Sequence, residues 1–170
     1  MIKNSSGTIL QATQNEDYSV NLGDPSTMNG GYHNHPGTGV NIFSADDIAI
    51  LIEIARYQAI GNAGNAYMVV VAPGGIHYVM YFNGTHNEIP AYGSYSTGQL
   101  DGWNKEQWKK NVDLISDNDI SINQRLEQIF LSTLENMGLQ NKVILQRVEE
   151  NKISTINQNS NGTPVPAPCN

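Results

Sequence analysis

Three side chains near residue 40 are of the types that bind a catalytic metal ion. His33 and His35 stand two residues apart in the segment Gly-Gly-Tyr-His-Asn-His-Pro, and Asp47 follows fourteen residues after His33. Residues two apart on an extended segment project to the same face, so we expect the two imidazoles to lie side by side. Two imidazoles and one carboxylate would leave a tetrahedral zinc ion with one open position, as in catalytic sites. A zinc ion held in this way makes a water molecule more acidic and polarises a carbonyl group.

The residues around this trio predict the elements that position it. Pro36 cannot continue a strand ladder, so the chain should turn away from the strand after His35. Ser44 is a favoured N-cap, and Asp46 and Asp47 place negative charge in the first helical turn, where the helix dipole favours it. The sequence predicts a helix over residues 44–60, and its apolar residues on almost every side indicate that it is buried.

The segment after this helix predicts a β-hairpin. Residues 66–72 and 76–82 have strand composition, and Pro73-Gly74-Gly75 joins them. The run Tyr67-Met68-Val69-Val70-Val71 is apolar throughout, which is typical of a strand covered on both faces. Residues 1–32, before the two histidines, predict short strands and turns.

The second half of the chain predicts mainly helices. Residues 104–116 and 120–138 have amphipathic spacing, residues 143–148 favour one further strand, and from Asn157 the composition indicates a poorly ordered tail. We therefore expect an α+β fold in which a mixed, curved sheet packs against helices. The expected organisation is a metal-binding core over 1–95, a helical extension with a return strand over 96–150 and a flexible tail over 151–170.

Charge and composition exclude several classes of function. The 170-residue chain has a net charge of −7 and only nine lysines and arginines, which form no cluster. Binding to nucleic acid or to an anionic membrane needs clustered positive charge, so we expect neither partner. Cys169 is the single cysteine, which excludes an intramolecular disulfide. No apolar run fits a signal peptide or a membrane span, so we expect a soluble, by default cytoplasmic protein, with export as part of a larger protein left open.

Taken together, these residues resemble the motif of a known family. His-x-His-Pro, a short loop and Ser-x-x-Asp are similar to the JAMM motif of the JAB/MPN family of zinc isopeptidases and peptidases, and the similarity covers about residues 30–82. The resemblance implies a JAB/MPN-like curved sheet packed with helices and, here, a helical C-terminal extension. It implies zinc held by His33, His35 and Asp47, with Ser44 stabilising the tetrahedral intermediate. A peptide or protein would be the substrate.

The chain departs from the family's spacing in the loop after Pro36. Seven residues separate Pro36 from Ser44, whereas the family has six. Asp46 therefore has the family's distance from His35, and Asp47 has its distance from Ser44. We favour Asp47 as the ligand because a helix fixes the Ser-to-Asp geometry while a loop absorbs an extra residue. Asp46 stays the alternative ligand.

The general base is the second departure. The family uses a glutamate on a strand well upstream of the histidines, and Glu16 is the only glutamate before His33. Glu16 lies in Gln14-Asn15-Glu16-Asp17, a composition that predicts a turn. Three explanations remain open. Glu16 substitutes for the base, the base precedes residue 1 in a longer parent chain, or the site is inactive.

Other interpretations of the same residues stand beside a zinc peptidase. The chain could be an inactive MPN-like binding module, a hydrolase of another amide bond, or part of a larger polymorphic-toxin or phage-related protein, where similar stand-alone members occur. Helix capping alone explains Ser44, and a charge favoured by the helix dipole explains Asp47. His77 and His86 have ordinary strand and turn settings. Trp103 and Trp108 are expected to anchor the first C-terminal helix to the core.

Overall fold

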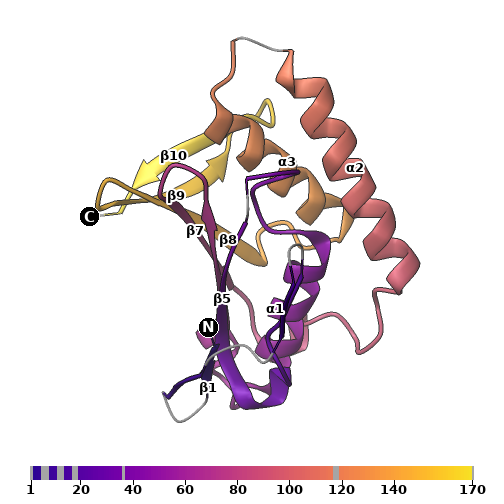
Figure 1. The fold of residues 1–170 in the computed structure, drawn as a ribbon. Helices are drawn as coiled ribbons and strands as arrows, with labels where there is room; N and C mark the ends of the chain where they lie inside the picture. Colours follow the sequence, from indigo (N-terminus) through magenta and orange to yellow (C-terminus); the bar gives the residue numbers. More distant parts are fainter. Residues whose placement is uncertain are drawn as a thin grey trace.

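A computed structural model gives the fold of the chain, which is α+β (Figure 1). The structure describes residues 2–4, 8–10, 14–16, 19–35, 37–116 and 119–169, without the side chains of 2–4, 9–10, 14–16 and 19–20. Its strands are β1 (Ile2–Asn4), β2 (Ile9–Leu10), β3 (Gln14–Glu16), β4 (Ser19–Asn21), β5 (Met28–Asn34), β6 (Tyr67–Ala72), β7 (Ile76–Phe82), β8 (Val143–Glu149), β9 (Lys152–Gln158) and β10 (Pro164–Pro168). Its α-helices are α1 (Ala45–Tyr57), α2 (Thr97–Ile115) and α3 (Ile122–Asn136), and short 3-10 helices cover Pro25–Thr27, Ala63–Asn65 and His86–Glu88.

One mixed sheet forms the centre of the molecule. Its strand order is β10-β9-β8-β7-β6-β5-β1-β2, and β3 and β4 form a separate two-stranded sheet. The pair β5–β6 is parallel and the other pairs are antiparallel. Helix α1 is the crossover between the two parallel strands, so the C-terminal end of β5 leads directly toward the N-terminus of α1.

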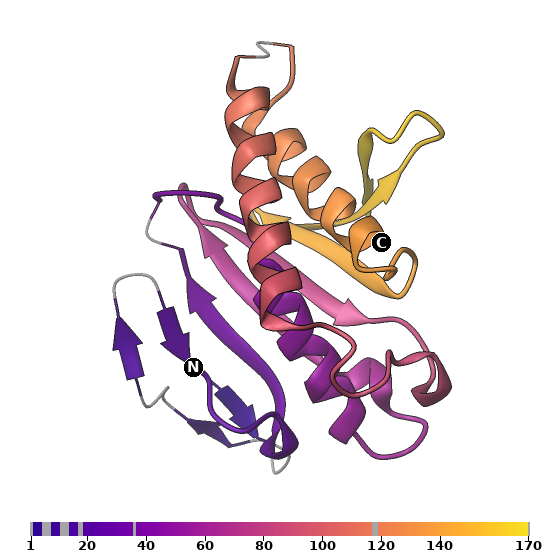
Figure 2. The same cartoon turned by 90° about the vertical axis from the view of Figure 1, so that its right-hand side faces the viewer.

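The α-helices α1, α2 and α3 of the described residues lie on one face of this sheet, as the two views show (Figures 1 and 2). Helix α1 packs against β5, β6 and β7, and α2 packs against both α1 and α3. The core lies between helices and sheet, with Ile48 and Ile52 of α1, Met68 of β6, Tyr78 of β7 and Phe130 of α3 nearly or fully inaccessible to solvent. Burial of these side chains is the main stabilising term of the fold.

The glycine-rich start of β5 permits the close approach of β5 and β6. A Cβ atom on Gly30 would lie 2.6 Å from the backbone oxygen of Tyr67, a separation that real Cβ atoms do not adopt. Gly30 pairs with Tyr67, and His33 pairs with Val70 further along the same ladder. Glycine at position 30 therefore permits the close pairing of β5 with β6, and strand alternation places His33 beside the buried Val70 on the core side of the sheet.

The first half agrees closely with the sequence predictions. Ser44 is the N-cap of α1, and the predicted hairpin is β6–β7. The continuous apolar run of β6 is buried on one face only. Met68, Val70 and Ala72 are buried, whereas the residues between them are partly exposed. The expectation that this strand is covered on both faces is therefore wrong for the described part of the chain.

The second half differs from the predicted organisation. The predicted tail over 151–170 contains β9 and β10, which pair with each other, and β9 pairs with β8. Strand β8 pairs with β7, so the sheet continues across the expected boundary at residue 95. Asn and Lys, which are depleted in strands, weaken the strand signal of β9 in the sequence, but the ladder to β8 satisfies its backbone groups. The 96–150 segment is part of the main fold rather than an appendage.

Strand β10 has an unusual composition for a sheet strand. Proline occupies every second position, at Pro164, Pro166 and Pro168, and β10 is the last strand at its end of the sheet. Between the prolines, the backbone N–H and C=O groups of Val165 and Ala167 point toward β9. Cys169 continues this alternation, and its backbone N–H donates to Ile153 O at 2.9 Å.

Among the described residues, no helix has both the length and the apolar composition needed to cross a membrane.

Candidate metal site

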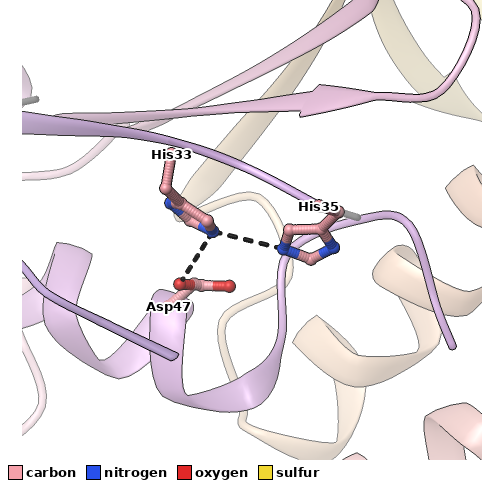
Figure 3. A group of neighbouring side chains, drawn as sticks. All are labelled: His33, His35 and Asp47. Carbon is pink, nitrogen blue, oxygen red and sulfur yellow. Dashed lines mark hydrogen bonds and ion pairs between the residues drawn. The ribbon is translucent and has the colours of Figure 1, made fainter. Parts of the chain in front are cut away.

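The side chains of His33, His35 and Asp47 converge on one point at the C-terminal end of β5 (Figure 3). His33 Nε2 lies 3.2 Å from His35 Nε2 and 3.5 Å from Asp47 Oδ1. In a tetrahedral zinc site with metal–ligand bonds of about 2.0–2.1 Å, two ligand atoms are separated by about 3.3–3.4 Å. One candidate ligand atom from each residue lies within 4.8 Å of the others. The donor set and its spacing therefore fit a small divalent ion such as zinc.

The backbone of the following loop orients His35. Its Nδ1 lies 3.1 Å from the carbonyl oxygen of Val40, so Nδ1 carries the proton and donates it there. This tautomer leaves the lone pair of Nε2 directed at His33 and Asp47, as metal-binding histidines require. Burial lowers the pKa of His35, and the nearby His33 lowers it further, although Asp47 and the Val40 hydrogen bond oppose this. A lowered pKa favours the neutral imidazole, which is the form that binds metal.

One ring nitrogen of His33 is not satisfied by the described part of the chain. His33 Nδ1 is buried and has no hydrogen-bond partner among the described residues. An unpaired ring nitrogen in the interior is costly, and residues that hold such atoms are often functional. The close approach of two imidazole Nε2 atoms is also unfavourable without a proton or an ion between them. Both features agree with a site shaped for a ligand rather than for packing alone.

Asp47 divides its two carboxylate oxygens between the helix cap and the histidines. Oδ2 accepts from the backbone N–H of Ser44 at 2.8 Å and from the Ser44 hydroxyl at 2.8 Å. The hydroxyl oxygen of Ser44 accepts in turn from Asp47 N, which completes a capping box. Burial opposes ionisation of Asp47, but His33 and the two Ser44 donors outweigh it and hold the pKa of Asp47 below its usual range. Oδ1 is therefore available and charged.

The two aspartates at the start of α1 have different surroundings. Asp46 is exposed, and its Oδ2 accepts from Asn104 Nδ2 of α2 at 2.5 Å. Asn104 Oδ1 also accepts from the backbone N–H of Ala45 at 2.8 Å, so one amide holds two groups of the helix start. The structure brings Asp47, not Asp46, to the two histidines. The extra residue in the loop after Pro36 is compatible with this arrangement, as the rigid Ser-to-Asp geometry suggests.

Helix α2 supports the segment before α1 through contacts that the sequence did not reveal. Gln107 is buried, and its Nε2 donates to Phe43 O at 3.1 Å and to Thr133 Oγ1 at 3.0 Å. The ring of Phe43 packs against Phe130 of α3 with centroids 5.9 Å apart. Asn104 lies 58 and 59 residues from Asp46 and Ala45, and Gln107 lies 64 residues from Phe43, so no local pattern predicts their role.

The other residues considered in the sequence lie outside the candidate metal site or are only partly described. Glu16 is the last residue of β3 and pairs with Ser19 of β4, so its backbone is a strand and not the predicted turn. The side chain of Glu16 and all of Pro36 lie outside the described residues. His77 contacts the ring of Tyr32, and His86 Nε2 lies 3.0 Å from Gln58 O. Neither histidine belongs to the candidate metal site.

A second polar cluster lies on the same side of the sheet as the candidate metal site. His33, Val70, Tyr78 and Arg147 pair in sequence across β5, β6, β7 and β8. Arg147 Nη1 donates to Oε1 of the buried Glu127 of α3 at 2.5 Å, and its Nε lies 3.4 Å from Glu149 Oε2. Burial raises the pKa of Glu127 to about 7, although Arg147 opposes the shift. Glu127 Oε2 is buried and has no hydrogen-bond partner in the described ranges.

Comparison of the chain with protein-family models, with curated proteins and with solved structures gave no match.

Proposed function

We propose that this chain is a zinc-dependent hydrolase that cleaves a peptide or isopeptide bond, with His33, His35 and Asp47 as the metal ligands. The observation that supports the proposal is the convergence of two imidazole nitrogens and one carboxylate oxygen at separations close to a tetrahedral edge. The motif resemblance to the JAB/MPN family suggests the bond type, and a JAB/MPN-like arrangement of the sheet and helices is part of the same proposal. Proteins or peptides are the proposed substrates.

The residues of this chain have distinct roles in the proposal. A bound zinc ion would supply Lewis acidity, acting on a water molecule and on the scissile carbonyl. Val40 holds His35 in the metal-binding tautomer, and Ser44 holds Asp47 in place through two hydrogen bonds. Ser44 is proposed to support the developing oxyanion as well, which requires its hydroxyl to turn from Asp47 during the reaction. Glu16 is the proposed proton acceptor because it is the only glutamate before His33.

Metal content tests the first part of the proposal. We expect the purified chain, reconstituted with zinc and desalted, to retain about one zinc ion per chain, and His35→Ala to retain none, because two remaining ligands hold zinc weakly. Elemental analysis measures both. His77→Ala is the matched control, since His77 lies on the opposite face of the sheet from His33 and should leave the zinc content unchanged. An absence of zinc in the wild-type protein after reconstitution would refute the proposal.

Substitution of Glu16 tests whether this residue is the base. Glu16→Gln should retain zinc while hydrolysis falls by about 10²–10⁴-fold, which is the usual contribution of general acid–base catalysis. The measurement uses fluorogenic peptides with either a main-chain or a lysine side-chain amide bond, beside zinc analysis of the same samples. Unchanged hydrolysis would remove Glu16 from the mechanism. A zinc-loaded wild type that cleaves none of these peptides would favour the alternative of an inactive binding module.

A further inference from the structure

The face of the sheet opposite the three helices presents no Asp, Glu, Lys or Arg side chain between β5 and β10. Residues on this face, here called the outer face, alternate along each strand with the buried residues of the core. Most of its central positions are apolar or aromatic, namely Val69, Val71, Val79, Tyr81, Ile144 and Val148, while His77 and Gln146 are the polar positions among them. All α-helices lie on the other face, so no described helix covers this surface (Figures 1 and 2).

The pairing of the strands makes these residues one continuous surface. Val69 pairs with Val79, and Tyr81 pairs with Ile144, so the side chains form rows across β6, β7 and β8. The rows extend to β9 and β10, where Ile153 and Val165 are each 44% exposed. An antiparallel sheet that faces water normally alternates apolar and polar residues, with the polar ones outward. Here most outward positions of β6, β7 and β8 are apolar or aromatic, and His77 and Gln146 carry no fixed charge of the Asp, Glu, Lys or Arg type, which favours a surface that another protein covers.

The lack of charge argues for a second copy of this chain as the partner. The protein carries a net charge of −7, so two copies repel each other over most of their surfaces. The outer face is a large region without fixed like charges, and depletion of charged residues with enrichment of aromatic ones is typical of homodimer interfaces. Two identical twisted sheets can also pack face to face, at about −30°.

The size of the outer face suffices for a dimer. Six strands about 4.8 Å apart, with about six residues each rising about 3.3 Å, present roughly 600 Å² per copy. Two copies would then bury roughly 1,200 Å², which is the lower end of the range for stable protein interfaces. An interface of this kind is isologous, with the same residues contributed by both copies.

We infer that the chain forms a symmetric dimer in which the outer faces of two sheets pack against each other. Val79 lies near the centre of the outer face, since it is in the middle of β7 and its strand has neighbours on both sides. The candidate metal site lies on the helix side of the sheet, so this dimer leaves it accessible. Dimer formation and zinc binding are therefore independent properties that separate experiments can measure.

A competing surface lies on α2. Trp108, Val112 and Ile115 are all exposed and recur at helical spacing, so they form an apolar stripe along α2. Trp108 is 59% exposed, and the expectation that it anchors α2 to the core is therefore wrong. Lys105 and Lys109 stand beside this stripe, whereas the outer face lacks charge. The stripe is also a single helix wide, which offers a second copy far less area than six strands. It provides the matched control for the dimer experiment.

Sedimentation velocity of the full chain at protein concentrations up to about 100 μM tests the inference. We expect the wild type to sediment with twice the 18.6 kDa mass of one chain. Val79→Lys should weaken the dimer by at least about 100-fold, because two like charges would meet in the interface. Val112→Lys on α2 should sediment as the wild type does. Equal parts of Val79→Lys and Val79→Glu should restore a dimer.

Each outcome decides the inference. A wild type that stays monomeric up to the highest concentration overturns it, and so does a dimer that Val112→Lys dissociates while Val79→Lys does not. Circular dichroism and zinc content of each variant show whether the fold is kept, since position 79 is partly exposed and can hold a lysine that extends into water. Should Val79→Lys not fold, Val69→Lys on the neighbouring strand gives the same test. A chain that binds no zinc but still forms the dimer would contradict the proposed function and leave the inferred dimer standing.

Discussion

Asp47→Asn should weaken zinc binding by more than about 100-fold, while Asp46→Asn should leave it unchanged. Loss of a second-shell partner typically costs about 10–100-fold in metal affinity, and loss of a charged ligand should cost more. Asp47 Oδ1 lies 3.5 Å from His33 Nε2, whereas Asp46 Oδ2 binds Asn104 of another helix. Competition with a coloured zinc chelator measures both affinities in the same buffer.

Asp46 is a useful control because it carries the same charge one residue away, but its carboxylate is exposed and binds Asn104 rather than facing His33. Both residues stand in the first turn of α1 and interact with the same helix dipole, worth about 0.3–1 kcal/mol per charge at exposed positions. A general effect of charge removal should therefore appear in both variants, and thermal unfolding without metal measures it. Equal losses of affinity in the two variants would contradict the assignment of Asp47 as the ligand. A loss in Asp46→Asn alone would restore the alternative that the motif spacing left open.

At pH 8, where Glu127 is mostly ionised, Arg147→Met should destabilise the protein by about 3–5 kcal/mol, the usual cost of leaving a buried charge without its partner. Glu127 is fully buried, and Arg147 is the partner of its Oε1. Chemical denaturation at fixed pH measures the change. Glu149→Gln is the control, because Glu149 is 43% exposed and a surface ion pair contributes only about 0–1 kcal/mol. Combining Arg147→Met with Glu127→Leu should recover much of the loss.

The pKa of Glu127 determines how this loss depends on pH. The folded-state pKa of about 7 lies above the ordinary value of 4.5, so the folded protein binds this proton more tightly than the unfolded chain. The contribution of Glu127 to the free energy of unfolding is therefore most favourable below pH 4.5 and falls as the pH rises toward 7. Without Arg147 the pKa should rise further, so Arg147→Met should cost more at pH 8 than at pH 5.5. An equal cost at both values would contradict this explanation.

The parts of the fold that were predicted correctly depend on local signals. The capping box at Ser44, the Pro-Gly-Gly turn before β7 and the apolar spacing of α3 each act within a few residues. The two histidines were recognisable for the same reason, since strand alternation alone places His33 and His35 on one side. Asp47 lies close to His33 because α1 begins near the C-terminal end of β5, which follows from the direction of the chain. The proposed zinc and hydrolase activity remain predictions.

What could not be predicted depends on contacts between distant segments. Strand β9 has a weak strand signal of its own, and only its ladder to β8 makes residues 152–158 a strand. The amides of Asn104 and Gln107 support the start of α1 from a helix that begins some 50 residues later. The pair of Glu127 and Arg147 joins a helix to a strand, and in the sequence each residue is typical of a solvated surface.

The prolines of β10 determine where the sheet can grow. Proline has no backbone N–H, and the N–H groups between the prolines face β9, so the free side of this strand offers carbonyl acceptors without donors. An added strand needs both, so this side is closed to edge-to-edge polymerisation and to capture of extended peptides. The prolines therefore prevent this sheet from forming fibrils through the free edge of β10. At this end of the sheet, two copies can associate only through the faces of the sheet and not by pairing edge strands.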